Sequence, residues 1–254
     1  MAPIWVLFWL FWGGINSEAT RGAVNFRQDQ LGQGILTSNP LLINQALTNG
    51  ADLNGRVPMT PALLQIAAGR STRIAHYFAE ETKATPLIMA ASLGDAALCN
   101  QFVRQGANRY LTSSWGWIAA QYAARCGYPE LARSLFNSDP AAAHYRIKIG
   151  IAPQTIILYK DGLAVVSGKI STGRKGHDTP PGYYLVTDKE RTRKSSLYKV
   201  PMPYFLRLSF SEYGIHQGYN PGRPASHGCI RVGKETVAKA LFDATPIGTL
   251  VTIN

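Results

Sequence analysis

One short stretch of the sequence gathers most of the residues that could do covalent chemistry. From His216 to Cys229 the chain holds two of its five histidines and one of its three cysteines, with glycines at 218, 222 and 228. A thiolate attacks carbonyl carbon, but a free cysteine has a pKa near 8.5, so a neighbouring imidazole must take its proton. The combination predicts Cys229 as a nucleophile and His216 as its general base.

The residues just before the cysteine could complete such a site. Ser226, His227 and Gly228 directly precede Cys229, and the glycine permits a tight turn. Backbone amides of a tight turn can point together at the oxyanion that forms on an attacked carbonyl. We assign this task to the main chain at Gly228 and Cys229, and supporting roles to Ser226 and His227.

Two other interpretations remain open on the residues alone. His216, His227 and Cys229 could bind zinc, although a fourth ligand is missing and the His-x-Cys spacing suits a tetrahedron poorly. The stretch could instead be a structural loop, although so polar a loop seldom keeps a free cysteine without a use. Cys99 and Cys126 lie among alanine and leucine in helical patterns, where cysteine usually acts as a small buried hydrophobe.

The candidate site lies in a half of the chain that is patterned like strands. Residues 144–254 are predicted to form a mostly antiparallel β domain with a hairpin turn at Asp161-Gly162 and one main helix over Lys234–Asp243. The charged run Asp188–Ser196 is interpreted as a loop. Strands are expected at 146–149, 155–159, 163–170, 183–187, 202–208 and 248–253.

The motifs of this half resemble the YkuD family of L,D-transpeptidases. His216 followed by Ser-His-Gly-Cys-Ile-Arg at 226–231 is similar to the family's active-site pattern. The family order is also kept by Ser-Thr-Gly at 171–173, Thr-Pro-x-Gly at 179–182, Met-Pro-Tyr at 202–204 and Gly-Ile-His at 214–216. The resemblance extends from Tyr145 to Asn254.

The resemblance implies peptidoglycan chemistry that needs no metal or organic cofactor. Cys229 would attack the bond between the third residue of a stem tetrapeptide, usually diaminopimelate, and the terminal D-alanine. The thioester would then pass to an amine, either on a second stem peptide, which makes a cross-link, or on an anchored protein. If water took the place of the amine, the protein would be an L,D-carboxypeptidase or a hydrolase that releases wall proteins.

The same resemblance implies roles for individual residues. His216 would be general base and acid, and the backbone at 227–229 would form the oxyanion hole. Arg231 would contact substrate or brace the loop, and Tyr204 and Ser226 would line the groove. Relatives often have Gly or Ser where this chain has Gln217, so the group that orients His216 is left open.

The first half of the chain is patterned as a helical array. Ala-Ala-x-Leu-Gly at 90–94 returns 33 residues later as Ala-Ala-x-Cys-Gly at 123–127, and Thr-Pro-Leu opens the segment at 85–87. Because this period and opening are typical of ankyrin repeats, we predict roughly three to four ankyrin-like repeats over residues 40–143. Residues 20–39 are interpreted as a linker. The whole is then an α+β multidomain protein, whose repeats serve as a protein-binding surface or as a packing platform.

The N-terminus resembles a secretory signal peptide. Residues 1–19 hold an apolar block of about nine residues, too short to span a bilayer, followed by small residues at Ser17 and Ala19. The alternatives are an uncleaved anchor and a misassigned start. The interpretation predicts export to the periplasm or cell wall, with no membrane-crossing segment later in the chain.

Charge narrows the range of partners. Residues 144–254 contain 16 Lys/Arg and seven Asp/Glu, a net +9, whereas residues 1–143 contain ten and eight, a net +2. A basic domain attracts polyanions such as anionic wall polymers. The sequence has no arginine-rich run or recognition-helix motif, so nucleic acid is not an expected partner. A non-enzymatic ankyrin adaptor with a wall-binding domain is the alternative to an enzyme.

Overall fold

The computed structural model describes residues 21–136, 139–196, 198–209 and 213–254. The chain folds into two compact units, the first ending at Ala119 and the second starting at Ala120. The predicted signal peptide, residues 1–19, falls outside the described residues. Across those that are described, every helix is too short or too polar to cross a membrane.

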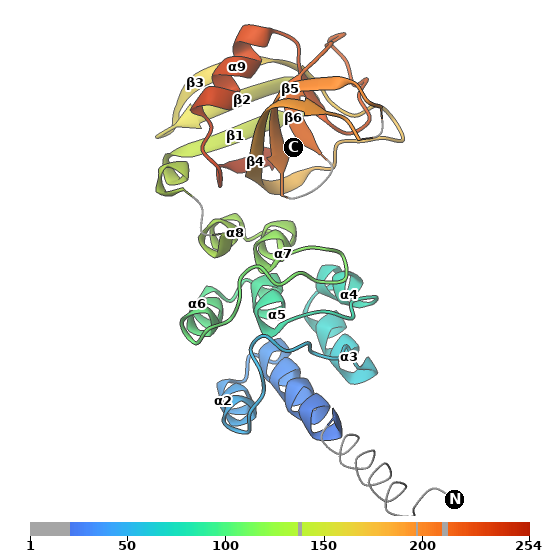
Figure 1. Ribbon diagram of the computed structural model, residues 1–254. Helices are drawn as coiled ribbons and strands as arrows, with labels where there is room; N and C mark the ends of the chain where they lie inside the picture. The colour runs from blue at the N-terminus through green and yellow to red at the C-terminus, as the bar shows by residue number, and fades with distance from the viewer. Residues whose placement is uncertain (1–20, 137–138, 197, 210–212) are drawn as a thin grey trace, which may run out of the picture. The chain divides into compact units, whose positions relative to one another are not determined.

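The first unit is built of consecutive helices (Figure 1). Three of them begin with proline directly after a side-chain cap, at Asn39, Thr60 and Thr85, whose oxygens accept backbone N–H groups of the first turn. The predicted helical array is therefore present, while its ankyrin character stays a prediction. The helices span residues 21–36, α2 (Pro40–Thr48), α3 (Pro61–Arg70), α4 (Thr72–Phe78), α5 (Pro86–Leu93) and α6 (Ala96–Arg104).

The interpretation of residues 20–39 as a linker is wrong for most of that segment. Residues 21–36 are helical, and Leu31 is fully buried. Glycine usually weakens a helix, but Gly32 permits close packing, because a Cβ there would lie 2.6 Å from Val57 Cγ1. Gly34 likewise permits a close approach, because a Cβ there would lie 2.9 Å from Ile43 Cγ1 of α2.

The second unit is a closed barrel with helices before and after it. The predicted mostly antiparallel β domain is confirmed, with parallel pairing only between β1 and β8 and between β6 and β7 among the described strands. The strand order is β1-β2-β3-β7-β6-β5-β4-β8. The strands are β1 (Tyr145–Gly150), β2 (Thr155–Lys160), β3 (Leu163–Ser171), β4 (Gly182–Lys194), β5 (Pro201–Leu208), β6 (Gly214–Gln217), β7 (Ile230–Val232) and β8 (Leu250–Ile253).

Helices α7 (Ala119–Cys126) and α8 (Pro129–Phe136) belong almost entirely to this second unit, followed by the 3₁₀ turn η1 (Pro140–His144). The Gln121 side chain donates to the Ser209 carbonyl oxygen, and Arg125 Nη1 donates to the Tyr184 hydroxyl over 3.1 Å. Because these bonds tie α7 to the barrel, the boundary between the two units lies before the domain boundary predicted at residues 143/144.

The charged run predicted as a loop is instead the second half of β4. Strand β4 continues to Lys194 and pairs with β5, for example Glu190 with Phe205. The sequence lacks apolar alternation here because several of these side chains serve polar contacts on the outside of the barrel. The loop prediction over Asp188–Ser196 is therefore wrong for Asp188–Lys194.

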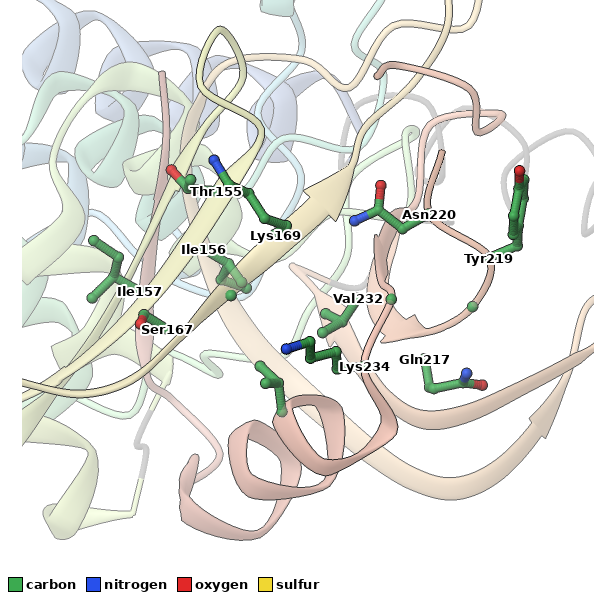
Figure 2. Close-up of a pocket in the computed structure, with 14 residues that line it drawn as sticks. Thr155, Ile156, Ile157, Ser167, Lys169, Gln217, Tyr219, Asn220, Val232 and Lys234 are labelled. Atoms are coloured by element: carbon green, nitrogen blue, oxygen red, sulfur yellow. The ribbon is translucent and has the colours of Figure 1, made fainter. Parts of the chain in front are cut away.

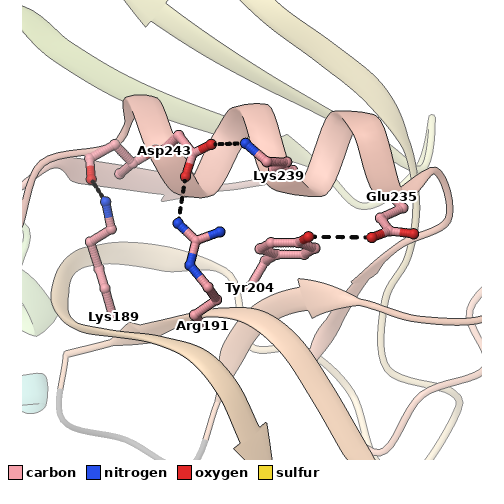
Figure 3. Close-up of polar contacts among 7 residues, drawn as sticks. Lys189, Arg191, Tyr204, Glu235, Lys239 and Asp243 are labelled. Atoms are coloured by element: carbon pink, nitrogen blue, oxygen red, sulfur yellow. Dashed lines mark hydrogen bonds and ion pairs between the residues drawn. The ribbon is translucent and has the colours of Figure 1, made fainter.

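Helix α9 (Glu235–Ala244) is fastened to the barrel by these outward-facing residues (Figure 3). Arg191 Nη2 lies 3.3 Å from Asp243 Oδ1, and the Tyr204 hydroxyl donates to Glu235 Oε1 over 3.2 Å. The apolar face of α9, with Leu241 fully buried, joins the barrel core. Exposed ion pairs contribute little each, so packing of this face carries most of the attachment.

Candidate active site

A cavity of about 500 Å³ collects five of the six side-chain-bearing residues predicted for the site. It opens beside the start of β7 and the hairpin that joins β4 to β5. The residues brought together are His216, Ser226, His227, Cys229 and Arg231.

The register of two parallel strands explains why the cysteine and the first histidine meet. Strands β6 and β7 pair so that His216 lies opposite Arg231. Residues two apart along extended chain share a face, and Cys229 is two residues before Arg231. Thirteen positions separate His216 from Cys229 in the sequence, but the pairing places both on the cavity side of the barrel.

His216 is oriented by its own neighbour's main chain. The side chain is only 6% exposed, and its Nδ1 lies 2.8 Å from the carbonyl oxygen of Gln217. A carbonyl oxygen only accepts, so Nδ1 carries the proton and Nε2 keeps its lone pair for a thiol. The group that the sequence left open is therefore a backbone carbonyl.

The electrostatic setting of His216 lowers the pKa of its imidazole and so favours the neutral form. Burial lowers its pKa, and the positive charge of Arg231 lowers it further, while the hydrogen bond to the Gln217 carbonyl acts in the opposite direction. A neutral imidazole at physiological pH is the form that can accept a proton.

His227 is unsuited to be the base. Arg174 Nη2 lies 2.8 Å from His227 Nε2, and since arginine only donates, this nitrogen is an acceptor already in use. The ring also contacts those of His177 and Tyr198, with centroids 4.8 and 4.6 Å away. Slight desolvation and the nearby charge of Arg174 lower its pKa. His227 forms part of the cavity wall.

The turn before the cysteine is held by Ser226. Its hydroxyl donates to the Cys229 carbonyl over 2.5 Å and accepts the Gly228 N–H over 3.1 Å. Gly228 has φ +112°, and a Cβ there would lie 2.4 Å from Tyr213 Cε1, so only glycine fits. The Gly228 N–H already donates to the Ser226 hydroxyl. To serve in an oxyanion hole as predicted, this N–H would have to donate to the oxyanion as well.

Three bracing residues were missed from the sequence. Thr179 Oγ1 accepts the Gly173 N–H and donates to the Gly228 carbonyl, both over 2.8 Å. Gln154 and Thr172 bond reciprocally, at 2.7 and 2.9 Å. The signal for Thr179 was present in the Thr-Pro-x-Gly motif, but its partner is a carbonyl 49 positions away, which sequence spacing does not reveal.

Tyr204 lies elsewhere than predicted. Its hydroxyl bonds to Glu235 on α9, and its ring packs against Phe242 with centroids 5.9 Å apart (Figure 3). It is not among the residues that line the active-site cavity. The Met-Pro-Tyr motif therefore positions α9 here.

The arrangement also bears on the zinc alternative. Among the described residues, no three or more His, Cys, Asp or Glu side chains are grouped so as to hold a metal ion. With His216 Nδ1 and His227 Nε2 both committed to protein partners, the arrangement favours a thiol–imidazole pair.

The barrel unit has counterparts among known proteins. A family model of the L,D-transpeptidase catalytic domain, YkuD, matches residues 144–253. No curated protein matches the chain.

Among solved structures, a cysteine-to-serine variant of the Enterococcus faecium L,D-transpeptidase is 26% identical over 44% of this chain and 50% of its own, with a TM-score of 0.40. An L,D-transpeptidase from Mycobacterium tuberculosis is 25% identical over 44% and 57%, also at 0.40. One from Stackebrandtia nassauensis is 23% identical over 50% and 65%, at 0.41. The chain thus spans between half and two thirds of the length of these structures.

The family match covers the barrel and α9, and it includes both Cys229 and His216. Residues 144–253 therefore match the catalytic domain of the YkuD type of L,D-transpeptidase.

Proposed function

We propose that the protein is a peptidoglycan L,D-transpeptidase with Cys229 as nucleophile and His216 as general base and acid. The observation that carries the proposal is the fixed tautomer of a buried imidazole, whose Nδ1 is held by the Gln217 carbonyl, in the cavity that also holds Cys229. Its substrate would be the stem tetrapeptide, and its acceptor an amine of a second stem or of a protein.

The first half-reaction forms a thioester. Nε2 of His216 takes the thiol proton of Cys229 as the sulfur attacks the carbonyl carbon that precedes the terminal D-alanine. A tetrahedral oxyanion forms against the main chain at 227–229. It collapses as the protonated His216 gives its proton to the leaving nitrogen, so that D-alanine departs as a neutral amine and the acyl group stays on sulfur.

The second half-reaction regenerates the thiol. An acceptor amine attacks the thioester while His216 takes one of its protons, and the new amide bond forms as the C–S bond breaks. The thiolate leaving group recovers the proton from His216. Water in place of the amine would give hydrolysis, so the outcome depends on which nucleophile reaches the thioester first.

Arg231 is suited to hold a carboxylate of the substrate. In the described part of the chain it has no carboxylate within ion-pair distance, whereas Arg193 and Arg207 of the same cavity pair with Glu190. A guanidinium binds a carboxylate through two parallel hydrogen bonds. The terminal D-alanine carries such a group.

A substrate in the cell wall also requires that the protein be exported. The helical unit has no part in the proposed chemistry and could serve a different role. We assign the first 19 residues to a secretory signal and the catalytic domain to the periplasm or cell wall. The ankyrin-like helices are then the candidate surface for a protein partner.

Neutralising Arg231 should move the acid limb of the pH profile to higher pH. Burial is the main cause of the lowered pKa of His216, and Arg231 adds to it, so Arg231→Gln raises that pKa and the neutral base is lost sooner as pH falls. Arg231→Lys keeps the charge and should leave the limb in place. The measurement is kcat/KM for a tetrapeptide between about pH 5 and 8. A limb that stays put in the glutamine variant contradicts this electrostatic role.

Digestion of muropeptides tests the function itself. The full chain is incubated with tetrapeptide-containing muropeptides, and products are identified by mass spectrometry. We expect dimers that have lost one D-alanine and are linked between the third residues of the two stems. Tripeptides without dimers would establish the hydrolase instead, and unchanged muropeptides would favour the non-enzymatic adaptor.

A further inference from the structure

A second cavity, of about 1030 Å³, lies at the other end of the short strand β7. Figure 2 shows its walls: β2 and β3 on one side, the 217–220 segment and the start of α9 on the other. The apolar residues of its lining include Ile156, Ile157, Val232 and Val237. The two cavities share no lining residue, yet His216 lines one and Gln217 the other.

Glycines give this groove its shape. A Cβ on Gly168 would lie 2.8 Å from Val237 Cγ1, and a Cβ on Gly233 would lie 2.9 Å from Asn220 Cβ. The missing side chains let α9 approach β3 and let Asn220 settle beside the rim. The groove is thus set by close backbone packing at two points.

The groove is positively charged and has amide groups at its edge. Lys169 and Lys234 line it, and no Asp or Glu is among its lining residues. Within the described residues, neither lysine has an ion-pair partner. Gln217 and Asn220 add carboxamides, and Figure 2 shows Lys234 extending into the groove from the α9 side. This chemistry suits a carboxylate flanked by peptide groups.

One wall of the groove is a strand edge. Strand β3 pairs with β7 only at Ile170 and Ser171, so from Leu163 to Lys169 no described strand pairs with that edge. Outward-facing Leu163 and Val165 are 73% and 50% exposed. Ser167, Gly168 and Lys169 of this strand line the groove, and Leu163 and Val165 continue the same edge beyond it. An unpaired strand edge can take up an extended peptide by adding a strand.

We propose that this groove is a second binding site, for an extended peptide that lies along the β3 edge and places a carboxylate between Lys169 and Lys234. The identification of this ligand as a wall stem peptide rests on the proposed function. The chemical class of the ligand, an extended peptide with free carboxylates, is inferred from the groove alone. The site adjoins the segment that holds the base, because the Gln217 carbonyl orients His216 while its residue lines the groove.

Binding is measured on the full chain carrying Cys229→Ala, so that no chemistry consumes the ligand. The probes are a synthetic stem tetrapeptide, the same peptide with its carboxylates amidated, and inorganic phosphate. We expect the free tetrapeptide to shift the backbone amide NMR signals of Lys169, Gly218 and Gly233. Lys169→Glu with Lys234→Glu should weaken the affinity measured from these shifts by about 10-fold or more, since attraction becomes repulsion.

A matched pair of exposed lysines controls for overall charge. Lys148→Glu with Lys160→Glu makes the same change in net charge on β1 and β2, outside the groove, and should leave the affinity unchanged. The proposal is overturned if the amidated peptide binds equally well, if the control pair loses as much, or if only active-site signals shift. Phosphate that gives the same shifts at the same concentration would reduce the site to one for simple anions and overturn the peptide assignment.

The outcome is separable from that of the muropeptide digest. Binding in the Cys229→Ala chain needs no catalysis, so a failed digest with a successful titration would remove the transpeptidase and keep the groove. A successful digest with no NMR shifts at the groove would keep the transpeptidase and remove the groove as a binding site.

Discussion

Cys229→Ala is expected to abolish formation of the acyl-enzyme and to lower turnover by roughly 10⁴-fold or more, the scale seen when a covalent nucleophile is removed. Without sulfur there is no atom to carry the acyl group, and His216 alone cannot form the thioester. The direct measurement is intact-protein mass spectrometry after exposure to a carbapenem, which should add one adduct to the wild-type chain and none to the variant.

The two remaining cysteines provide the control. Burial raises the pKa of the Cys99 thiol to about 12, so it stays protonated and unreactive. Cys126 is partly exposed and is the stricter comparison. Cys126→Ala should keep both the adduct and the turnover. An adduct that survives in Cys229→Ala but disappears in Cys126→Ala would show that the nucleophile is Cys126 and not Cys229.

His216→Gln is expected to slow acylation by about 10²–10⁴-fold, the usual contribution of general acid–base catalysis. The amide side chain can still occupy the buried position but cannot take a proton. The rate should then climb with pH toward the ionisation of a free thiol, near pH 8.5, because no base assists its deprotonation. Stopped-flow acylation by a carbapenem across this range measures both effects.

His227→Gln separates the two imidazoles. Because His227 Nε2 is already bonded to Arg174, its loss should alter affinity through the cavity wall and leave the shape of the pH profile unchanged. If the His227 variant lost the acid limb and the His216 variant kept it, the assignment of the base would have to be exchanged.

Residue types indicated the candidate reacting groups because cysteine and histidine are rare and their chemistry is specific. They could not reveal what holds those groups. His216 is oriented by the Gln217 carbonyl, and the turn at Gly228 is tied by Thr179 from a distant loop. A main-chain acceptor exists at every position, so it leaves no mark in the sequence.

The fold was predicted best where burial alternates along a strand and least well where it does not. The outer half of β4 is charged because its side chains meet α9 and solvent, and it was interpreted as a loop. Residues 21–36 contain glycine for contact and were interpreted as a linker. In the same way, Tyr204 was expected to line the active-site cavity, but its hydroxyl donates to Glu235 of α9, which lies 31 positions further along the chain.

The bond between His216 and the Gln217 carbonyl separates two kinds of constraint at one position. Any amino acid at 217 supplies the same carbonyl, so the imidazole proposed as the base is expected to tolerate variation there as long as the backbone keeps its path. The side chain at 217 is free to diversify with whatever ligand meets the neighbouring groove. If the groove binds the proposed peptide, substitutions at this position are expected to change that binding and to leave the proposed catalysis unchanged, which makes position 217 a first choice for libraries that seek altered selectivity.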